Sequence, residues 1–265
     1  MSRLGAFFRE IGDGPGVVCL HANSSSSSQW RALMERLAPR FHVLAADAFA
    51  SGKSPAWEGG RLQLRDEVAL LEPVFACAGE SFTLVGHSYG AAVALIAALG
   101  MPGRVRAMAL YEPTLFSLLD AESPPPNDAD GIRNAVANAV AALEEGDRDR
   151  AAQKFIDFWM HRGAWEAMSE SRKGSIRDSI HCLPEWGAAL FSEPTSLAQF
   201  AQLDIPVLYM IGKASPLSSR GVGRLLAATL PCAQVIEFEG LGHMGPVTHP
   251  EIVNEAIFHF LNAQI

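Results

Sequence analysis

The sequence predicts an α/β protein with a mostly parallel sheet flanked by helices. Short apolar runs alternate with segments of helical periodicity up to residue 111, and the alternation returns after residue 205. Between these two parts lies a long stretch with helical patterns only. Strands that alternate with helices are joined by right-handed crossovers, which makes neighbouring strands parallel and covers both faces of the sheet with helices.

The strands and helices of the α/β part are expected in a regular order. Each strand is a short, mainly apolar run, and each helix carries apolar side chains three or four positions apart. The expected strands are residues 16–20, 41–46, 82–85, 105–111, 206–211 and 233–238. The expected helices are residues 29–38, 61–78, 91–99, 221–230 and 249–262.

The stretch from Pro113 to about Gln202 contains no convincing strand and predicts a helical insert. It includes a proline-rich linker at 123–127, and its helical patterns cover residues 132–145, 150–160, 165–182 and 184–190. Because open α/β sheets bind ligands at the carboxyl ends of their strands, we interpret the insert as a cap over that edge. The predicted organisation is therefore a core of residues 1–113 and 200–265 with a helical cap of residues 114–199.

Composition limits the possible partners. The chain has 265 residues, of which 49% are hydrophobic and 19% charged, and a formal net charge of −8. This negative charge argues against binding to nucleic acid or to an anionic membrane surface. No apolar run reaches transmembrane length and the N-terminus lacks the pattern of a signal peptide, so we expect a cytoplasmic protein with no membrane contact.

Neither a cofactor nor a metal is expected. The four cysteines are scattered and form no C-x-x-C pair, and no cluster has the spacing of metal ligands. No glycine-rich nucleotide-binding motif is present either. We therefore interpret the cysteines as reduced, unreactive thiols.

A motif of the form G-x-S-x-G is the strongest functional signal. Gly86-His87-Ser88-Tyr89-Gly90 lies between an apolar run and an alanine-rich helical segment. This strand–turn–helix context favours Ser88 as a nucleophile over a chance glycine-serine turn. Because the turn opens a helix, the backbone amide of Tyr89 would face a developing oxyanion.

A serine hydroxyl needs a base, and His243 is the best candidate. It lies in the glycine-rich segment 240–246, directly after the last expected strand. From there its side chain can reach over the sheet toward Ser88. None of the other seven histidines has this setting.

With these residues the chain resembles an α/β-hydrolase over nearly its whole length. The matching stretches are His21-Ala22-Asn23, the segment from Asp47 to Ser54, residues 86–90 and Gly242-His243. The resemblance implies a mostly parallel sheet of about eight strands with an inserted helical cap. It also implies an oxyanion hole built from the amides of Asn23 and Tyr89, although Ala22 replaces the glycine that this family usually carries.

The third catalytic residue departs from the family pattern. The loop that usually carries an aspartate reads Gly212-Lys213-Ala214-Ser215-Pro216, and no carboxylate occurs between Asp204 and Glu237. Glu112, which ends the strand after the nucleophile helix, is the best replacement, because some family members such as certain haloalkane dehalogenases place the acid there. A dyad of Ser88 and His243 supported by a serine or a water is the alternative.

The leading hypothesis is a cofactor-free serine hydrolase that cleaves a carboxylic ester, lactone or thioester through an acyl-enzyme on Ser88. Aromatic residues of the insert would provide an apolar pocket, and its acidic excess disfavours strongly anionic substrates. We therefore expect an apolar small-molecule substrate. A C–C hydrolase or a perhydrolase on the same fold is one alternative, and a ligand-binding protein with weakened hydrolase machinery is another. The oligomeric state stays open.

Overall fold

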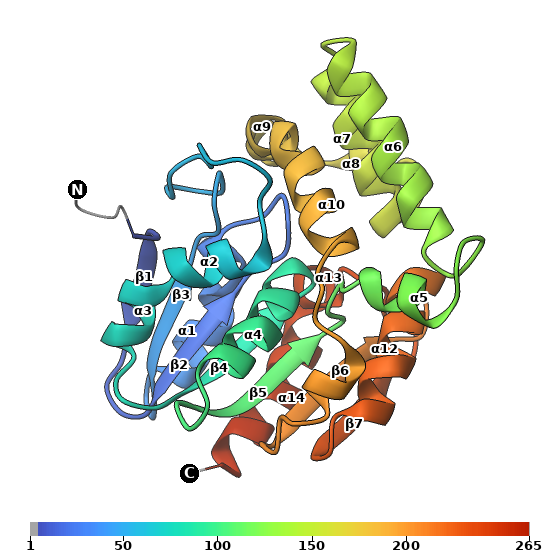
Figure 1. The fold of residues 1–265 in the computed structure, drawn as a ribbon. Helices are drawn as coiled ribbons and strands as arrows, with labels where there is room; N and C mark the ends of the chain where they lie inside the picture. Colours follow the sequence, from blue (N-terminus) through green and yellow to red (C-terminus); the bar gives the residue numbers. More distant parts are fainter. Residues whose placement is uncertain (1–4, 265) are drawn as a thin grey trace.

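The computed structural model describes residues 5–264 and contains one seven-stranded sheet. The order of strands is β1-β3-β2-β4-β5-β6-β7, and all neighbouring pairs are parallel except β1 and β3 (Figure 1). The strands are β1 (Phe8–Ile11), β2 (Gly16–Leu20), β3 (His42–Ala46), β4 (Phe82–His87), β5 (Val105–Tyr111), β6 (Val207–Gly212) and β7 (Ala233–Phe238). The mostly parallel α/β architecture predicted from the sequence is confirmed.

Seven strands occur within residues 5–264, close to the predicted number of about eight. One of the seven, β1, has no counterpart among the strands expected from periodicity. It has four residues, three of them exposed, and it forms an edge of the sheet. A strand buried so little carries no clear apolar pattern.

Two helical layers cover the sheet. Helices α1 (Arg31–Leu37) and α14 (Pro250–Asn262) pack against one face, where alternate residues of the strands form a continuous apolar cluster. The opposite face is covered by α2 (Leu64–Leu70), α3 (Glu72–Cys77), α4 (Tyr89–Gly100) and α12 (Leu217–Thr229). The central strands are apolar on both sides because both of their faces are buried.

The helix expected over residues 61–78 is divided into α2 and α3. Leu71 ends the first helix, and Pro73 stands near the start of the second. Proline has no backbone N–H to continue the helical hydrogen bonds, but it is tolerated in the first turn of a helix. The apolar periodicity runs through this break and therefore does not reveal it.

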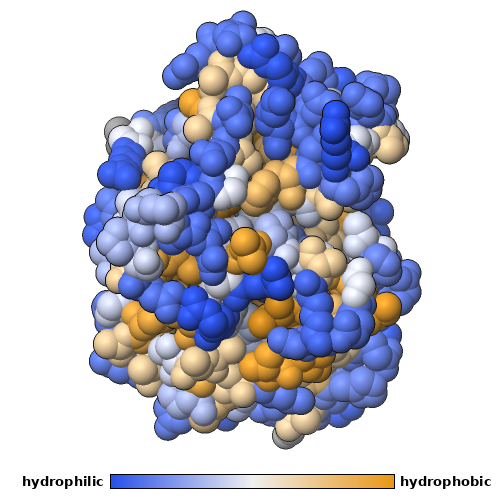
Figure 2. All heavy atoms as spheres, turned by 90° about the vertical axis from the view of Figure 1, so that its right-hand side faces the viewer, coloured by the Kyte–Doolittle hydropathy of each residue, from blue (hydrophilic) through white to orange (hydrophobic). Residues whose placement is uncertain are grey.

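Between β5 and β6, the described chain is helical. Its elements are α5 (Ser117–Glu122), α6 (Asp130–Glu144), α7 (Arg148–Trp159), α8 (Ala164–Ala167), α9 (Glu170–Ser179), η2 (Ile180–Cys182), α10 (Leu183–Phe191) and α11 (Leu197–Phe200). Helices α6 to α10 stack beyond one end of the sheet (Figure 1). The outer end of this helical stack is largely hydrophilic, whereas apolar side chains gather lower on the face shown in Figure 2.

Two single turns complete the chain: η1 (Ser27–Trp30) precedes α1, and α13 (Gly245–Thr248) precedes α14. Helix α5 packs against α12. Within residues 5–264, no helix combines the length and the apolar composition that crossing a membrane requires.

Candidate active site

Ser88 occupies a sharp turn between β4 and α4. Its backbone has φ 57° and ψ −116°, a strained conformation for a residue other than glycine. Both glycines of the motif are required by close approach: a Cβ at Gly86 would lie 2.5 Å from Ala91 Cα, and one at Gly90 would lie 2.4 Å from the Leu20 carbonyl oxygen. The motif therefore folds as the strand–turn–helix that its sequence indicates.

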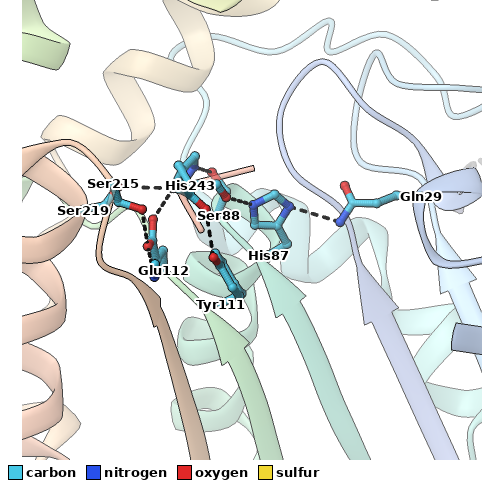
Figure 3. A network of polar contacts seen from close by, with 10 residues as sticks. Gln29, His87, Ser88, Tyr111, Glu112, Ser215, Ser219 and His243 are labelled. Atoms are coloured by element: carbon cyan, nitrogen blue, oxygen red, sulfur yellow. Dashed lines mark hydrogen bonds and ion pairs between the residues drawn. The ribbon is translucent and has the colours of Figure 1, made fainter. Parts of the chain in front are cut away.

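Ser88, His243 and Glu112 form a continuous chain of hydrogen bonds (Figure 3). The Ser88 Oγ lies 2.8 Å from His243 Nε2, and His243 Nδ1 lies 2.6 Å from Glu112 Oε2. All three side chains are buried. Because the carboxylate accepts from Nδ1–H, the neutral imidazole keeps Nε2 free to accept the serine proton.

Glu112 follows β5 in a backbone conformation with φ 46°, which is also unusual outside glycine. Its Oε1 accepts hydrogen bonds from the Gly212 amide at 2.7 Å and from the Ser215 hydroxyl at 2.6 Å. Ser215, at the position where the family usually has an aspartate, therefore contacts the glutamate. The Ser219 Oγ, in the first turn of α12, lies 3.2 Å from His243 Nδ1.

The segment around His243 is fixed by two donors from neighbouring strands. The Tyr111 hydroxyl donates to the Gly242 carbonyl at 2.8 Å, and His87 Nε2 donates to the His243 carbonyl at 2.8 Å. The Gln29 amide donates to His87 Nδ1 at 3.1 Å, which fixes this tautomer (Figure 3). Burial, together with the nearby His243, holds the pKa of His87 well below its usual value, so His87 stays neutral.

The two amides expected in the oxyanion hole lie on segments that are joined to each other. The Gly90 amide donates to the His21 carbonyl at 3.1 Å, which connects the turn that carries Ser88 to the loop that carries Asn23. His21 donates to the Ala22 carbonyl at 2.7 Å, and burial lowers its pKa. Within residues 5–264, neither the Asn23 nor the Tyr89 amide donates a hydrogen bond, so both remain available to a ligand.

A cavity of about 600 Å³ opens next to Ser88 and His243. Asn23 and the serines of the following loop line one part of it. The chain between β5 and β6 contributes a mainly apolar part of the lining, which includes Phe116, Ile132, Phe155, Trp159, Leu190 and Phe191. The site can therefore hold a ligand with a substantial apolar part next to the Ser88 hydroxyl.

The sequence profile of the family described as alpha/beta hydrolase fold matches residues 15–250. The chain belongs to the α/β-hydrolase fold family. Its relatives include the pimeloyl-[acyl-carrier protein] methyl ester esterase of Aeromonas hydrophila, 26% identical over 267 residues that cover 95% of this chain and 97% of the relative. The enzyme of the same name from Chromobacterium violaceum is 26% identical over 97% of this chain and 98% of its own length.

Solved structures agree with this family. An α/β hydrolase from Sphaerobacter thermophilus has a TM-score of 0.73 at 26% identity, with 97% of this chain and 96% of that chain covered. The esterase RhEst1 from a Rhodococcus species has a TM-score of 0.79 at 23% identity, with 97% and 94% covered, a likeness that shows the fold alone. The family match and the relatives support a serine ester hydrolase on the α/β-hydrolase fold.

Sequence reasoning missed three polar residues of this α/β hydrolase. Gln29 carried no signal beyond its place at the start of a helix. Ser219 lies in the first turn after the loop with Ser215, so inspection of that turn could have found it. Glu67 had the clearest signal, because it is a charged residue on the buried side of α2, spaced three positions from Leu64 and Leu70.

Glu67 lies on α2 and is hydrogen-bonded to the first residue of α4. Its Oε1 accepts from the Tyr89 hydroxyl at 3.0 Å, and its Oε2 accepts from the Phe49 amide at 3.1 Å. The carboxyl group is buried, and this burial raises its pKa to about 7 against the two hydrogen bonds, which lower it. A second buried glutamate is thus connected to Tyr89, the residue that follows Ser88.

Proposed function

We propose that this α/β hydrolase is a cofactor-free serine esterase that forms an acyl-enzyme on Ser88, with lactones and thioesters as related substrates. The observation that carries the proposal is the buried chain of hydrogen bonds from Ser88 through His243 to Glu112, of which Ser88 and His243 line a mainly apolar cavity. A nucleophile, a base and an orienting acid in hydrogen-bond sequence are the parts that acyl transfer needs.

The first half of the reaction forms the acyl-enzyme. Ser88 Oγ attacks the ester carbonyl while its proton passes to His243 Nε2. The amides of Asn23 and Tyr89 stabilise the oxyanion of the tetrahedral intermediate. Glu112 holds the Nδ1–H tautomer and faces the imidazolium that forms. His243 then returns the proton to the departing alcohol oxygen as the carbonyl is restored.

The second half of the reaction releases the acid. A water molecule replaces the alcohol next to His243 and attacks the acyl carbonyl while Nε2 takes its proton. Collapse of the second tetrahedral intermediate breaks the bond to Ser88 Oγ, which regains a proton from His243. The same residues therefore serve both steps, and no cofactor enters either of them.

We further propose residues 114–199 as a cap on a core of residues 1–113 and 200–265. Aromatic residues from this segment line the cavity, which favours a substrate with an apolar acyl or alcohol part. Charged side chains of both signs, Arg31, Glu35 and Arg172, also line it, so the preference against strongly anionic substrates stays a prediction. Methyl esters of acyl chains belong in a substrate panel because the relatives are named for such an ester.

The decisive experiment is Ser88→Ala. Loss of a nucleophile that acts as a unit with its base should lower p-nitrophenyl acetate hydrolysis by on the order of 10⁴-fold or more. Labelling by a fluorophosphonate probe should disappear, while circular dichroism stays that of the parent. Ser192→Ala, at an exposed position at the end of α10, is the matched control and should keep both activities.

Residual hydrolysis within about tenfold of the parent would contradict the serine mechanism. Labelling of Ser88 without turnover of any ester would instead favour a ligand-binding protein with weakened machinery. A peracid assay beside the ester panel distinguishes a perhydrolase from an esterase.

A further inference from the structure

Trp159, the last residue of α7, lies directly over the imidazole of His243. The two ring centroids are 4.0 Å apart with an angle of 28° between the ring planes, which is a stacked arrangement. Only 7% of the tryptophan is exposed. The base proposed for the reaction therefore has a contact from the helical segment as well as from the sheet.

The indole is held in place by other aromatic rings. Phe158 and Phe155 approach it edge-on, with centroids 4.9 Å and 6.2 Å away, and Phe116 stacks at 6.4 Å. Aromatic pairs prefer edge-to-face and offset-stacked geometries, so these contacts favour one orientation of the indole. Trp159 thus presents its face to His243 in one orientation.

The charges of the other groups around His243 determine what the Trp159 ring can contribute. Glu112 contacts Nδ1 and is the carboxylate that faces a protonated ring, while Ser88 and Ser219 contribute neutral hydroxyls. His87, whose ring centroid is 5.3 Å away, is kept neutral by its burial, and its Nδ1 accepts from Gln29. No cation other than His243 itself is therefore present in this set of contacts among the described residues.

We propose that Trp159 is a positioning residue that holds His243 and stabilises its imidazolium form. A cation over an aromatic face is attracted by the quadrupole of the ring, and the attraction is strongest for tryptophan. The neutral imidazole lacks that attraction, so the contact strengthens as the proton moves from Ser88 to His243. An interaction that is stronger in the transition state than in the ground state accelerates the reaction.

This inference rests on the proposed serine mechanism and extends it to the helical segment. If Trp159 acts in this way, helix α7 belongs to the catalytic unit and does more than form a wall of the cavity. A purely structural tryptophan would be expected to fill space only, and the two roles differ in the pH dependence that they predict.

Removing the indole has two opposing consequences for protonated His243. Loss of the aromatic face destabilises the imidazolium, which moves the acid limb of the rate profile to lower pH. Entry of water solvates the imidazolium, which moves the same limb to higher pH. The direction in which the acid limb moves therefore distinguishes stabilisation of the imidazolium by the indole from simple exclusion of water.

The test compares Trp159→Phe and Trp159→Leu in kcat/KM for p-nitrophenyl acetate between about pH 5 and about pH 9. We expect Trp159→Leu to lose between about 2-fold and about 30-fold, mainly in kcat, and its acid limb to move to lower pH. Trp159→Phe keeps an aromatic face and should lie between the parent and the leucine variant. Trp165→Leu is the matched control, because Trp165 is equally buried in the helical segment but faces Lys173 and Arg177.

A second measurement does not depend on turnover. A protonated imidazole in contact with an indole quenches its fluorescence, so the spectra of Ser88→Ala and Ser88→Ala/Trp159→Phe should differ by a signal that titrates with His243. A titrating difference together with full activity of Ser88→Ala would refute the serine mechanism but leave the contact intact. A difference that stays flat, or an acid limb that moves to higher pH in Trp159→Leu, would overturn the role of Trp159.

Discussion

Two glutamates with almost no exposed surface, Glu112 and Glu67, are each connected to the turn that carries Ser88, but their surroundings differ. Glu112 accepts from an amide, a hydroxyl and the imidazole of His243. Glu67 accepts from one amide and from the hydroxyl of Tyr89. Only the first site includes a group that can become a cation during the reaction.

The difference shows what a buried carboxylate needs in order to act as an orienting acid. Burial penalises the charged form, and two neutral donors do not offset this at Glu67, whose pKa is raised to about 7. At Glu112 the imidazole that takes the proton from Ser88 lies within hydrogen-bond distance. The same residue type can therefore serve catalysis on one side of the site and structure on the other.

Of the two buried glutamates, Glu112 is expected to show the larger effect on substitution, in Glu112→Gln. The amide oxygen of the glutamine would keep the bonds to Gly212 and Ser215, so its NH₂ group would face His243 Nδ1. The imidazole would then carry its proton on Nε2 and could not accept the proton of Ser88. We expect kcat to fall by on the order of 10²- to 10⁴-fold with little change in KM.

Steady-state kinetics at the pH optimum measure this effect, and Glu67→Gln is the matched control with the same substitution at the other buried glutamate. If both substitutions were equally mild, the contrast between the two sites would have no catalytic meaning. If both were equally severe, Glu67 would belong to the catalytic unit as well.

Ser215→Ala should have a smaller effect. It removes one donor to Glu112 Oε1, while the Gly212 amide still holds that oxygen. A single hydrogen bond to a charged group contributes about 1.5 to 3 kcal/mol, of which only the part that differs in the transition state changes kcat. We expect a loss in kcat of less than about tenfold. A crippling Ser215→Ala beside a nearly silent Glu112→Gln would mean a serine-supported dyad without an acid.

The resemblance to α/β-hydrolases, together with the topology of the sheet, was sufficient to predict Glu112 beside His243. Parallel neighbouring strands bring their carboxyl ends to one edge, and the loop that usually carries the acid has no carboxylate. Seven strands were likewise close to expectation, since buried parallel strands are continuous apolar runs. The exposed edge strand β1 and the break at Pro73 have no such signature.

Side-chain contacts across the helical segment could not be predicted in the same way. Trp159 was one of several aromatic residues at helical spacing, and nothing in that spacing tells which of them meets His243. Which aromatic residue meets His243 depends on where α7 lies relative to the sheet. That position is set by packing against residues distant from α7 in the sequence. The network from Gln29 to His87 is equally a product of tertiary structure.

Glu67→Gln should have the smallest effect on kcat and a measurable effect on stability. The folded-state pKa of Glu67, about 7, lies above the ordinary value of 4.5, so the protonated carboxyl is the form that the fold favours. The contribution of the protonated Glu67 carboxyl to folding stability is fully present below its pKa in the unfolded chain, and it is lost as pH rises through its pKa in the folded protein. The difference between these two pKa values of Glu67 corresponds to about 3 kcal/mol of unfolding free energy, which is lost between about pH 4 and about pH 8.

Glutamine has no proton to lose, and it can still bind both the Phe49 amide and the Tyr89 hydroxyl. Urea unfolding at a series of pH values should therefore show that the unfolding free energy of the variant increases relative to that of the parent as pH rises from about 4 to about 8. Over the same range kcat should stay within about twofold of the parent. Parallel stability curves would mean that Glu67 titrates at its ordinary value in the folded protein. Burial would then not distinguish the two glutamates, and their different roles would follow from the position of His243 alone.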